Sequence, residues 1–219
     1  MIFYPIFTME IIWHGYKCFT VKTKSGSIIV DPYSAESGLT LSSKRADAIV
    51  FTEEENKENN PEAVSDNPKI FNWPGEYEVA GIALNVRELP LSKSKEKKNP
   101  ILMTFEVDNI RIGYLTDLTM NITDEMIEEF GNIDIFIIPV DQKNNDYKQF
   151  NAIMEEIEPR IVIPIDYVTP GLTLKIDEIG PFLKKIGIES AQTQDKFSAN
   201  SKSNLPSEKT EFVVLNPQV

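Results

Sequence analysis

The alternation of apolar and polar positions in the first half of the chain is typical of short β-strands separated by turns. The first three strands form a meander with a tight turn at residues 24–26. Breaks at residues 74–75 and at Gly81 predict a second meander over residues 69–86, and the turn at residues 108–109 predicts a hairpin. The predicted strands are residues 10–13, 18–23, 27–30, 48–52, 69–73, 77–79, 82–86, 101–107 and 110–115.

The pattern changes to helical spacing after Thr123, which is placed to cap a short helix over residues 124–130. An apolar stripe predicts an amphipathic helix at 147–157, and a further helix at 176–186 is interrupted near residues 180–181. Strands are predicted at 133–140, 160–165 and 211–215, and a mobile loop at 198–207. Hairpin strands followed by strands that alternate with helices predict a layered α/β protein with more than one sheet, built as one domain over residues 9–219 after an N-terminal extension of residues 1–8.

Charge and composition narrow the classes of function. The chain has 219 residues, of which 41% are hydrophobic, and its 34 acidic against 22 basic residues give a net charge of −12, so duplex nucleic acid is a poor partner. No stretch of about 18 apolar residues predicts a membrane span. Residues 1–8 lack the features of a signal peptide, and the single cysteine, Cys18, fits a reducing compartment, so we expect a cytoplasmic protein.

The single histidine, His14, is a strong chemical constraint, because no His-x-His pair or histidine cage can form. Its place beside a glycine favours a hydrogen-bonded structural residue over a general base. Cys18, in an apolar strand, is expected to be an inert core thiol. Glu76 and Glu78 share one face of a strand, which is typical of a solvent-exposed face and only secondarily of an acid–base pair. No glycine-rich phosphate loop supports a nucleotide cofactor.

Six segments, in this order, resemble the metallo-β-lactamase fold superfamily, and in particular its cytoplasmic branch of metal-dependent hydrolases related to L-ascorbate-6-phosphate lactonase. The segments are IWHGYKCF at 12–19, IVDPY at 29–33, ADAIVFT at 46–52, PGEYEVAG at 74–81, YLTDL at 114–118 and PRIVIPIDY at 159–167. The resemblance implies an αββα four-layer sandwich with a binuclear metal site at the sheet edge where the two halves of the fold meet.

The sequence departs from this family where the metal ligands are expected. After the strand that ends at Thr52, the family has a His-x-His-x-Asp-His run, and it has another ligand histidine after the Ile-Pro pair of the last matching segment. Only Asp117 agrees with a family ligand in type and place. The residues of this chain at the family ligand positions are Glu53, Glu55, Lys57, Glu58, Asp117 and Asp166.

Exchanging imidazoles for carboxylates lowers the preference for zinc and favours hard cations such as Mg²⁺, Mn²⁺ or Ca²⁺. The Lys57 ammonium also brings positive charge toward any bound ion. If the carboxylates converged, each pair would repel by about 4 kcal/mol at ~4 Å and an effective dielectric constant of about 20. They must therefore bind a hard cation, take up protons, pair with Lys57 or turn into solvent. The polar residues 53–60 favour the last outcome, so neither zinc nor another resident cofactor is expected.

Three functions are consistent with these residues. The first is a degenerate, non-catalytic binding or scaffold protein that has lost the histidine dinuclear site and binds an unidentified protein or small molecule. The alternative is a hydrolase of phosphodiesters, lactones or similar esters that uses Mg²⁺ or Mn²⁺ held by Asp117, Asp166 and some of Glu53, Glu55 and Glu58. The third is a structural subunit of a homo-oligomer whose old cleft is closed by side chains.

Overall fold

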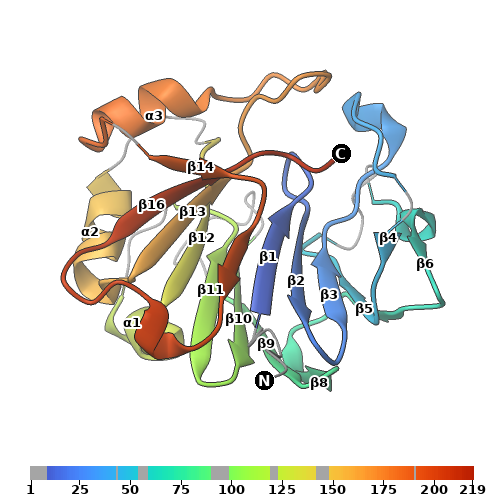
Figure 1. Ribbon diagram of the computed structural model, residues 1–219, viewed down its shortest axis with the longest axis horizontal. Coiled ribbons are helices and arrows are strands. Elements are labelled where there is room, and N and C mark those ends of the chain that lie inside the picture. Colours follow the sequence, from blue (N-terminus) through green and yellow to red (C-terminus); the bar gives the residue numbers. More distant parts are fainter. Residues whose placement is uncertain are drawn as a thin grey trace, which may run out of the picture.

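Two large β-sheets pack face to face in the computed structural model, and helices lie outside the larger sheet (Figure 1). The structure describes residues 9–42, 44–53, 59–89, 99–118, 123–141, 148–189 and 191–219. The predicted layered α/β class with more than one sheet is confirmed. Within the described residues, no helix is long and apolar enough to cross a membrane.

The six-stranded sheet has the order β15-β1-β2-β3-β5-β7. The opening meander is confirmed, because β1, β2 and β3 pair antiparallel in sequence, whereas β5 and β7 join in parallel. The mobile loop predicted at 198–207 is wrong at its start, because Phe197 and Ala199 are buried and their strand pairs with β1. The strands are β1 (Met9–Trp13), β2 (Phe19–Thr23), β3 (Ser27–Val30), β5 (Ala48–Val50), β7 (Lys69–Phe71) and β15 (Phe197–Ala199).

The eight-stranded sheet has the order β14-β16-β13-β12-β11-β10-β9-β8. Its strands pair antiparallel from β8 to β11 and parallel from β11 to β14. The predicted hairpin turn is confirmed at Asp108 and Asn109, which both have positive φ (47° and 65°). The strands are β8 (Gly75–Val79), β9 (Ile82–Glu88), β10 (Ile101–Val107), β11 (Ile110–Leu115), β12 (Ile135–Pro139), β13 (Ile161–Ile165), β14 (Gln192–Gln194) and β16 (Glu211–Leu215).

The predicted second meander is wrong, because its three segments are divided between the two sheets. Strand β7 lies parallel to β5 at the edge of the six-stranded sheet, whereas β8 and β9 form the edge of the eight-stranded sheet. The chain crosses between the sheets at Trp73 and Pro74, where proline ends the pairing. Stacked rings of Phe71 and Tyr77, with centroids 4.2 Å apart, connect the two edges.

Three α-helices are described: α1 (Asp124–Phe130), α2 (Lys148–Ile157) and α3 (Ile179–Lys185). Thr123 caps α1 as predicted, because its Oγ1 accepts a hydrogen bond of 3.4 Å from the Met126 N–H. The predicted interruption of the third helix near residues 180–181 is wrong, because α3 is continuous. It begins at Ile179, so Pro181 lies in the first turn, where N–H groups have no intrahelical acceptor.

In the described part of the chain, no α-helix covers the outer face of the six-stranded sheet. A second apolar cluster lies there, in which Ile29 and Ile49 pack with Tyr33, Leu39 and Phe51. The covering segments contain the 3₁₀ helices η1 (Ala35–Ser37) and η2 (Pro61–Ala63) and a ribbon of β4 (Lys44–Arg45) and β6 (Val64–Ser65), whereas η3 (Lys202–Asn204) follows β15.

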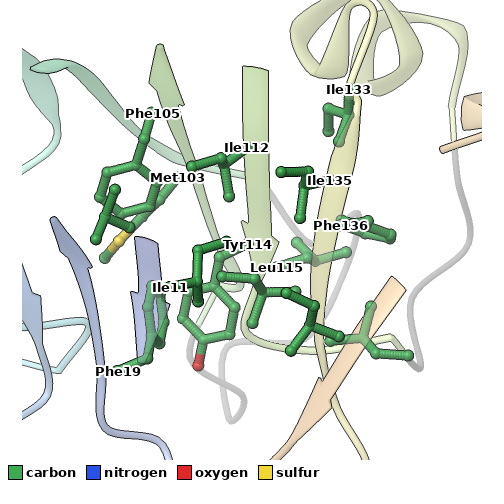
Figure 2. Packing of buried hydrophobic residues seen from close by; sticks show 14 of the residues in the cluster. Ile11, Phe19, Met103, Phe105, Ile112, Tyr114, Leu115, Ile133, Ile135 and Phe136 are labelled. Carbon is green, nitrogen blue, oxygen red and sulfur yellow. The ribbon is translucent and has the colours of Figure 1, made fainter. Parts of the chain in front are cut away.

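The main core fills the space between the sheets and continues under the helices. Phe19 of the six-stranded sheet packs edge-on against Phe105 and Tyr114 of the eight-stranded sheet, with centroids 6.1 and 5.1 Å away (Figure 2). Strands β12 and β13 are buried at every position, because helices cover one face and the other sheet covers the second. Edge-on aromatic pairs of this kind fix the sheets against each other, and so fix the strand ends that carry the site.

Candidate functional site

Polar residues gather at one edge of the sandwich, where β3, β5, β11 and β13 end and where the turn between β1 and β2 lies. We call this group the Lys17 cluster. Since β3 and β5 are parallel, as are β11, β12 and β13, residues at their carboxyl ends meet at the same edge of each sheet. The members of the Lys17 cluster are Tyr16, Lys17, Asp31, Glu53, Tyr114 and Asp166.

Asp31 follows β3 directly and is buried. Its carboxylate accepts two hydrogen bonds of 2.7 Å, one from the Thr52 N–H and one from the Thr52 hydroxyl. Burial raises the pKa of Asp31 to about 6, although the Thr52 hydrogen bonds and the charge of Lys17 act in the opposite direction. Asp31 therefore fixes the end of β5 and, with it, the position of Glu53.

Asp166 follows β13 directly and is also buried. Its backbone N–H donates a 3.0 Å hydrogen bond to the Tyr16 carbonyl, which ties the β1–β2 turn to the end of β13. Tyr16, Asp31 and Asp166 all have positive φ, of 50°, 45° and 58°. Non-glycine residues adopt this left-handed conformation at an energetic cost, and such residues concentrate at functional sites.

Lys17 is a half-buried cation among these carboxylates. Burial lowers the pKa of its ammonium, but the charges of Asp166, Glu53 and Asp31 outweigh this effect and hold the pKa above its ordinary value. The ammonium also lies 5.4 Å from the centroid of the Tyr16 ring, within cation–π range. Lys17 was not a candidate from sequence, although a lysine directly before the core residues Cys18 and Phe19 was the available signal.

Tyr114 of β11 is fully buried, and its hydroxyl has no hydrogen-bond partner among the described residues. Burial raises the pKa of this hydroxyl well above its ordinary value, and the negative charges of Asp31 and Asp166 raise it further. Figure 2 shows the ring beside Phe19, with the hydroxyl at the rim of the apolar cluster. Because buried hydroxyls are nearly always hydrogen-bonded, this one marks a place for a polar ligand or water.

Two of the residues at the family ligand positions, Glu53 and Asp166, both raise the pKa of Lys17 through their negative charges. Asp117 lies two residues after β11 and is half-buried. Glu55, Lys57 and Glu58 lie outside the described residues. Within the described ranges, no three histidine, cysteine, aspartate or glutamate side chains form a group that could hold a metal ion.

His14 has the structural role that its sequence context predicted. Its Nε2 lies 2.8 Å from the Thr20 Oγ1, and its Nδ1 lies 3.1 Å from the carbonyl oxygen of Gln218 near the C-terminus. The Tyr33 hydroxyl donates to the His14 carbonyl. Burial lowers the pKa of His14 to about 4. Both ring nitrogens are thus engaged away from the carboxylates of the Lys17 cluster.

Two further predictions from sequence are confirmed. Cys18 is fully buried, and burial raises the pKa of its thiol well above the ordinary value, as expected of an unreactive core thiol. Glu76 and Glu78 are exposed on β8, and Glu76 pairs with Arg87 at 3.2 Å. These two carboxylates therefore lie on a solvent face.

The dinuclear zinc site that the family resemblance implies does not fit these residues. Zinc prefers imidazole nitrogen and thiolate sulfur. The only imidazole binds Thr20 and Gln218, the only thiol is in the core, and Lys17 places a positive charge among the carboxylates. The residues at positions 55, 57 and 58 add two carboxylates and a second lysine in place of the family's histidines and aspartate.

Comparisons with known proteins agree with this fold. Residues 10–166 match the family described as Beta-lactamase superfamily domain. A UPF0173 protein of Pyrococcus abyssi is 24% identical, over 74% of this chain and 85% of the relative. A metallo-β-lactamase superfamily structure from Thermotoga maritima is 23% identical, with a TM-score of 0.74 over 94% of this chain and 98% of that chain. A metallo hydrolase from Ignicoccus hospitalis is 15% identical, with a TM-score of 0.56 over 83% and 92% of the two chains.

Proposed function

Because the chain belongs to the β-lactamase superfamily but carries no imidazole in the Lys17 cluster, we propose that it is a non-catalytic member that binds a partner. One observation carries this proposal: both nitrogens of the sole histidine are held by Thr20 and Gln218. The partner is a protein or a small molecule. The net charge of −12 favours partners other than duplex nucleic acid.

Zinc hydrolysis needs a polarising ion that is held in a fixed geometry with one open position. That ion lowers the pKa of a bound water and stabilises the charge that develops on the ester oxygen. A cluster of oxygen donors around an ammonium provides neither the nitrogen ligands nor a position free of competing positive charge. The proposal includes a cytoplasmic location, which the single, buried cysteine supports.

The proposal is tested on the purified full chain by elemental analysis and by hydrolysis assays. The protein is produced in medium with added zinc and manganese, and its metal content is measured per chain. Turnover of an activated phosphodiester and of a lactone is then followed with Zn²⁺, Mn²⁺ or Mg²⁺. We expect a metal content far below stoichiometric and rates equal to those of buffer with the same ion. A family member that keeps the histidine run serves as the positive control.

The opposite result has a clear form. Stoichiometric metal, together with turnover that Asp117→Ala abolishes, would establish the alternative, a carboxylate-based hydrolase that uses Mn²⁺ or Mg²⁺. Metal-free protein that is a stable oligomer through residues 53–60 would instead favour a structural subunit. A metal-free, inactive protein that binds a separate partner supports the proposal.

A further inference from the structure

The edge strand β7 exposes large apolar side chains at one side of the six-stranded sheet. It is the last strand in the sheet order, so its second side has no partner strand among the described residues. Ile70 of β7 is 50% exposed, and Trp73, two residues after the strand, is 63% exposed. In the described ranges, only Val168 and Val219 are other large hydrophobic residues that are exposed. Exposed apolar residues that gather in one place mark interaction surfaces.

The backbone groups of Ile70 point to the open side of β7. The Lys69 N–H donates to the Asp47 carbonyl at 2.9 Å, and the Phe71 carbonyl accepts from the Phe51 N–H at 3.0 Å. Lys69 and Phe71 therefore direct their backbone groups toward β5. Since successive residues of a strand bond to alternate sides, the Ile70 N–H and C=O face away from β5. A strand that pairs with this edge finds one donor and one acceptor at Ile70.

Ile70 also ends a row of isoleucines that crosses the outer face of the six-stranded sheet. Ile29 is the register partner of Ile49, and Ile49 is the register partner of Ile70, so the three side chains are neighbours on one face. Ile29 and Ile49 are fully buried in the second apolar cluster, whereas Ile70 is half exposed. The row is open only at the edge, and an apolar side chain beside Ile70 would complete it.

Trp73 is held at the same edge by its neighbours. Its carbonyl accepts a 2.8 Å hydrogen bond from the Tyr77 hydroxyl, and the Tyr77 ring stacks on Phe71 with centroids 4.2 Å apart. An aromatic residue on a fixed backbone is a typical anchor of protein interfaces, because little conformational freedom is lost when it is buried.

The distribution of charge favours a second copy of this chain as the occupant of the edge. The net charge of −12 makes two copies repel each other over most of their surfaces. Residues 67–75, between Asp66 and Glu76, contain no acidic residue, and their only charged residue is Lys69. Two copies can therefore approach here with little repulsion, and the positive charge of Lys69 is attracted to the acidic surface of the other copy.

We propose that the β7 edge joins two copies of this chain, whose β7 strands pair antiparallel about a two-fold axis at Ile70. The Ile70 N–H of each copy then donates to the Ile70 carbonyl of the other, and the two side chains cover each other. Pro68 and Pro74 have no N–H, so they confine the pairing to this short stretch and to one register. The contact uses the same surface of both copies and occupies the free edge of each, so assembly stops at the dimer.

The inference is independent of the proposed function. The contact lies at residues 69–73, and it forms with or without chemistry in the Lys17 cluster.

The experiment measures the mass of the full chain in solution by sedimentation equilibrium, from about 1 µM to about 500 µM protein. We expect a dimer with a Kd of about 10 µM, as is typical of a small interface. The dimer should become tighter in about 0.5 M sodium chloride, because salt screens the repulsion between the acidic copies. Trp13 is fully buried and Trp73 is exposed, so tryptophan emission should shift to longer wavelength on dilution, as Trp73 meets water.

Two variants remove the contact separately. Ile70→Ser and Trp73→Ser should each weaken the dimer at least tenfold, and the emission shift should be absent from Trp73→Ser. Val168→Ser is the matched control, because Val168 is 45% exposed and lies outside this edge, and its dimer should equal that of the native chain. Urea denaturation of all three variants checks that each is folded.

Several results would overturn the inference. A native chain that is monomeric at every concentration has no such contact, even if a different protein binds the edge. A dimer that persists unchanged in both Ile70→Ser and Trp73→Ser is formed by another surface. Neither result bears on the proposed function, which fails only if the chain holds stoichiometric metal and turns over substrate, and that finding would leave the dimer in place.

Discussion

Asp134 and Asp166 are both buried carboxylates beside parallel strands of the eight-stranded sheet, but they lie at opposite ends of those strands. Asp134 precedes β12, and its oxygens meet Lys202 at 3.0 Å, Arg160 at 3.4 Å and the Arg111 N–H at 3.0 Å. One carboxylate there faces two cations and an amide. In the Lys17 cluster, three carboxylates raise the pKa of one lysine, beside three non-glycine residues of positive φ and the Tyr114 hydroxyl, which has no hydrogen-bond partner among the described residues.

The difference separates a structural ion pair from a candidate site on the same sheet. At the Asp134 end, the buried carboxylate has two cationic partners and a backbone donor, so its charge is satisfied and the group stabilises the fold. At the Lys17 end, the charge is compensated only in part and three non-glycine residues have positive φ. Partly compensated buried charge and positive φ both lower the stability of the fold, and both are typical of ligand-binding or catalytic sites.

The largest expected effect comes from restoring the family's ligands at the Lys17 end. The variant combines Lys17→Ser with Glu53→His, Glu55→His, Lys57→Asp, Glu58→His and Asp166→His. It should bind zinc with a Kd below about 1 µM, which corresponds to roughly 8 kcal/mol of binding free energy. Zinc is measured by competition with a chromogenic chelator. The same set with Asp166→Asn in place of Asp166→His is the control and should bind more weakly. Equal affinity of the two would show that position 166 is not a ligand.

The second prediction contrasts the two buried aspartates by stability. Asp134→Asn leaves two cations without their carboxylate and should cost about 3 kcal/mol of unfolding free energy. Asp166→Asn relieves repulsion and should cost much less or stabilise the fold. Urea denaturation of both variants measures the contrast. Equal losses would mean that the Lys17 cluster is an ordinary structural ion pair.

The third prediction concerns the pH dependence of stability that two buried groups, His14 and Asp31, produce. The pKa of His14 is about 4 in the folded protein against 6.5 for a free histidine, so the unfolded chain binds the proton more tightly. Stability from His14 is therefore complete above pH 6.5 and falls by roughly 3 kcal/mol as the pH drops to about 4.

Asp31 acts in the opposite direction, because its pKa is raised to about 6 from 3.8 and its ionisation favours unfolding as the pH rises through this range. The two effects offset each other in the native protein, so the variant His14→Gln is needed to separate them. The difference in unfolding free energy between native protein and His14→Gln, measured from pH 4 to 7, should shrink toward low pH. A constant difference would contradict the assigned role of His14.

The smallest effect is expected at the exposed pair of Glu76 and Arg87, which lies outside both regions. Their side chains are 74% and 45% exposed, so Glu76→Gln should change the unfolding free energy by less than about 0.5 kcal/mol. The effect is measured by urea denaturation. A larger loss of unfolding free energy would show that Glu76 makes a structural contribution beyond that of an exposed ion pair.

Much of the fold could be predicted from local pattern, because alternation and turn residues specify a strand without knowledge of its neighbours. The turn at Asp108 and Asn109 and the cap at Thr123 are examples. Sheet membership could not be predicted in the same way. Strand β7 pairs with β5 across 18 intervening residues (51–68), and the polar β14 has no apolar alternation to reveal it.

Sequence comparison named only two of the residues that the structure places in the Lys17 cluster. Glu53 and Asp166 were found by comparing residues with the expected ligands, and the charges of both raise the pKa of Lys17. Lys17, Asp31 and Tyr114 were not identified as site residues, because each has meaning only through tertiary neighbours. The segment WHGYKCF alone does not determine whether its lysine lies on the surface or beside carboxylates. The environment of Lys17 depends on which strand ends lie beside the β1–β2 turn in the folded protein.

The last residues of the chain have a practical consequence for any search for a binding partner. The Gln218 N–H donates to the Trp13 carbonyl, and the Gln218 carbonyl accepts from Lys44 at 3.0 Å. A resin or sensor chip coupled there would pull on the turn that carries Lys17. Strand β1 begins at Met9, at the far end from that turn, so bait protein should be immobilised through its amino-terminal side.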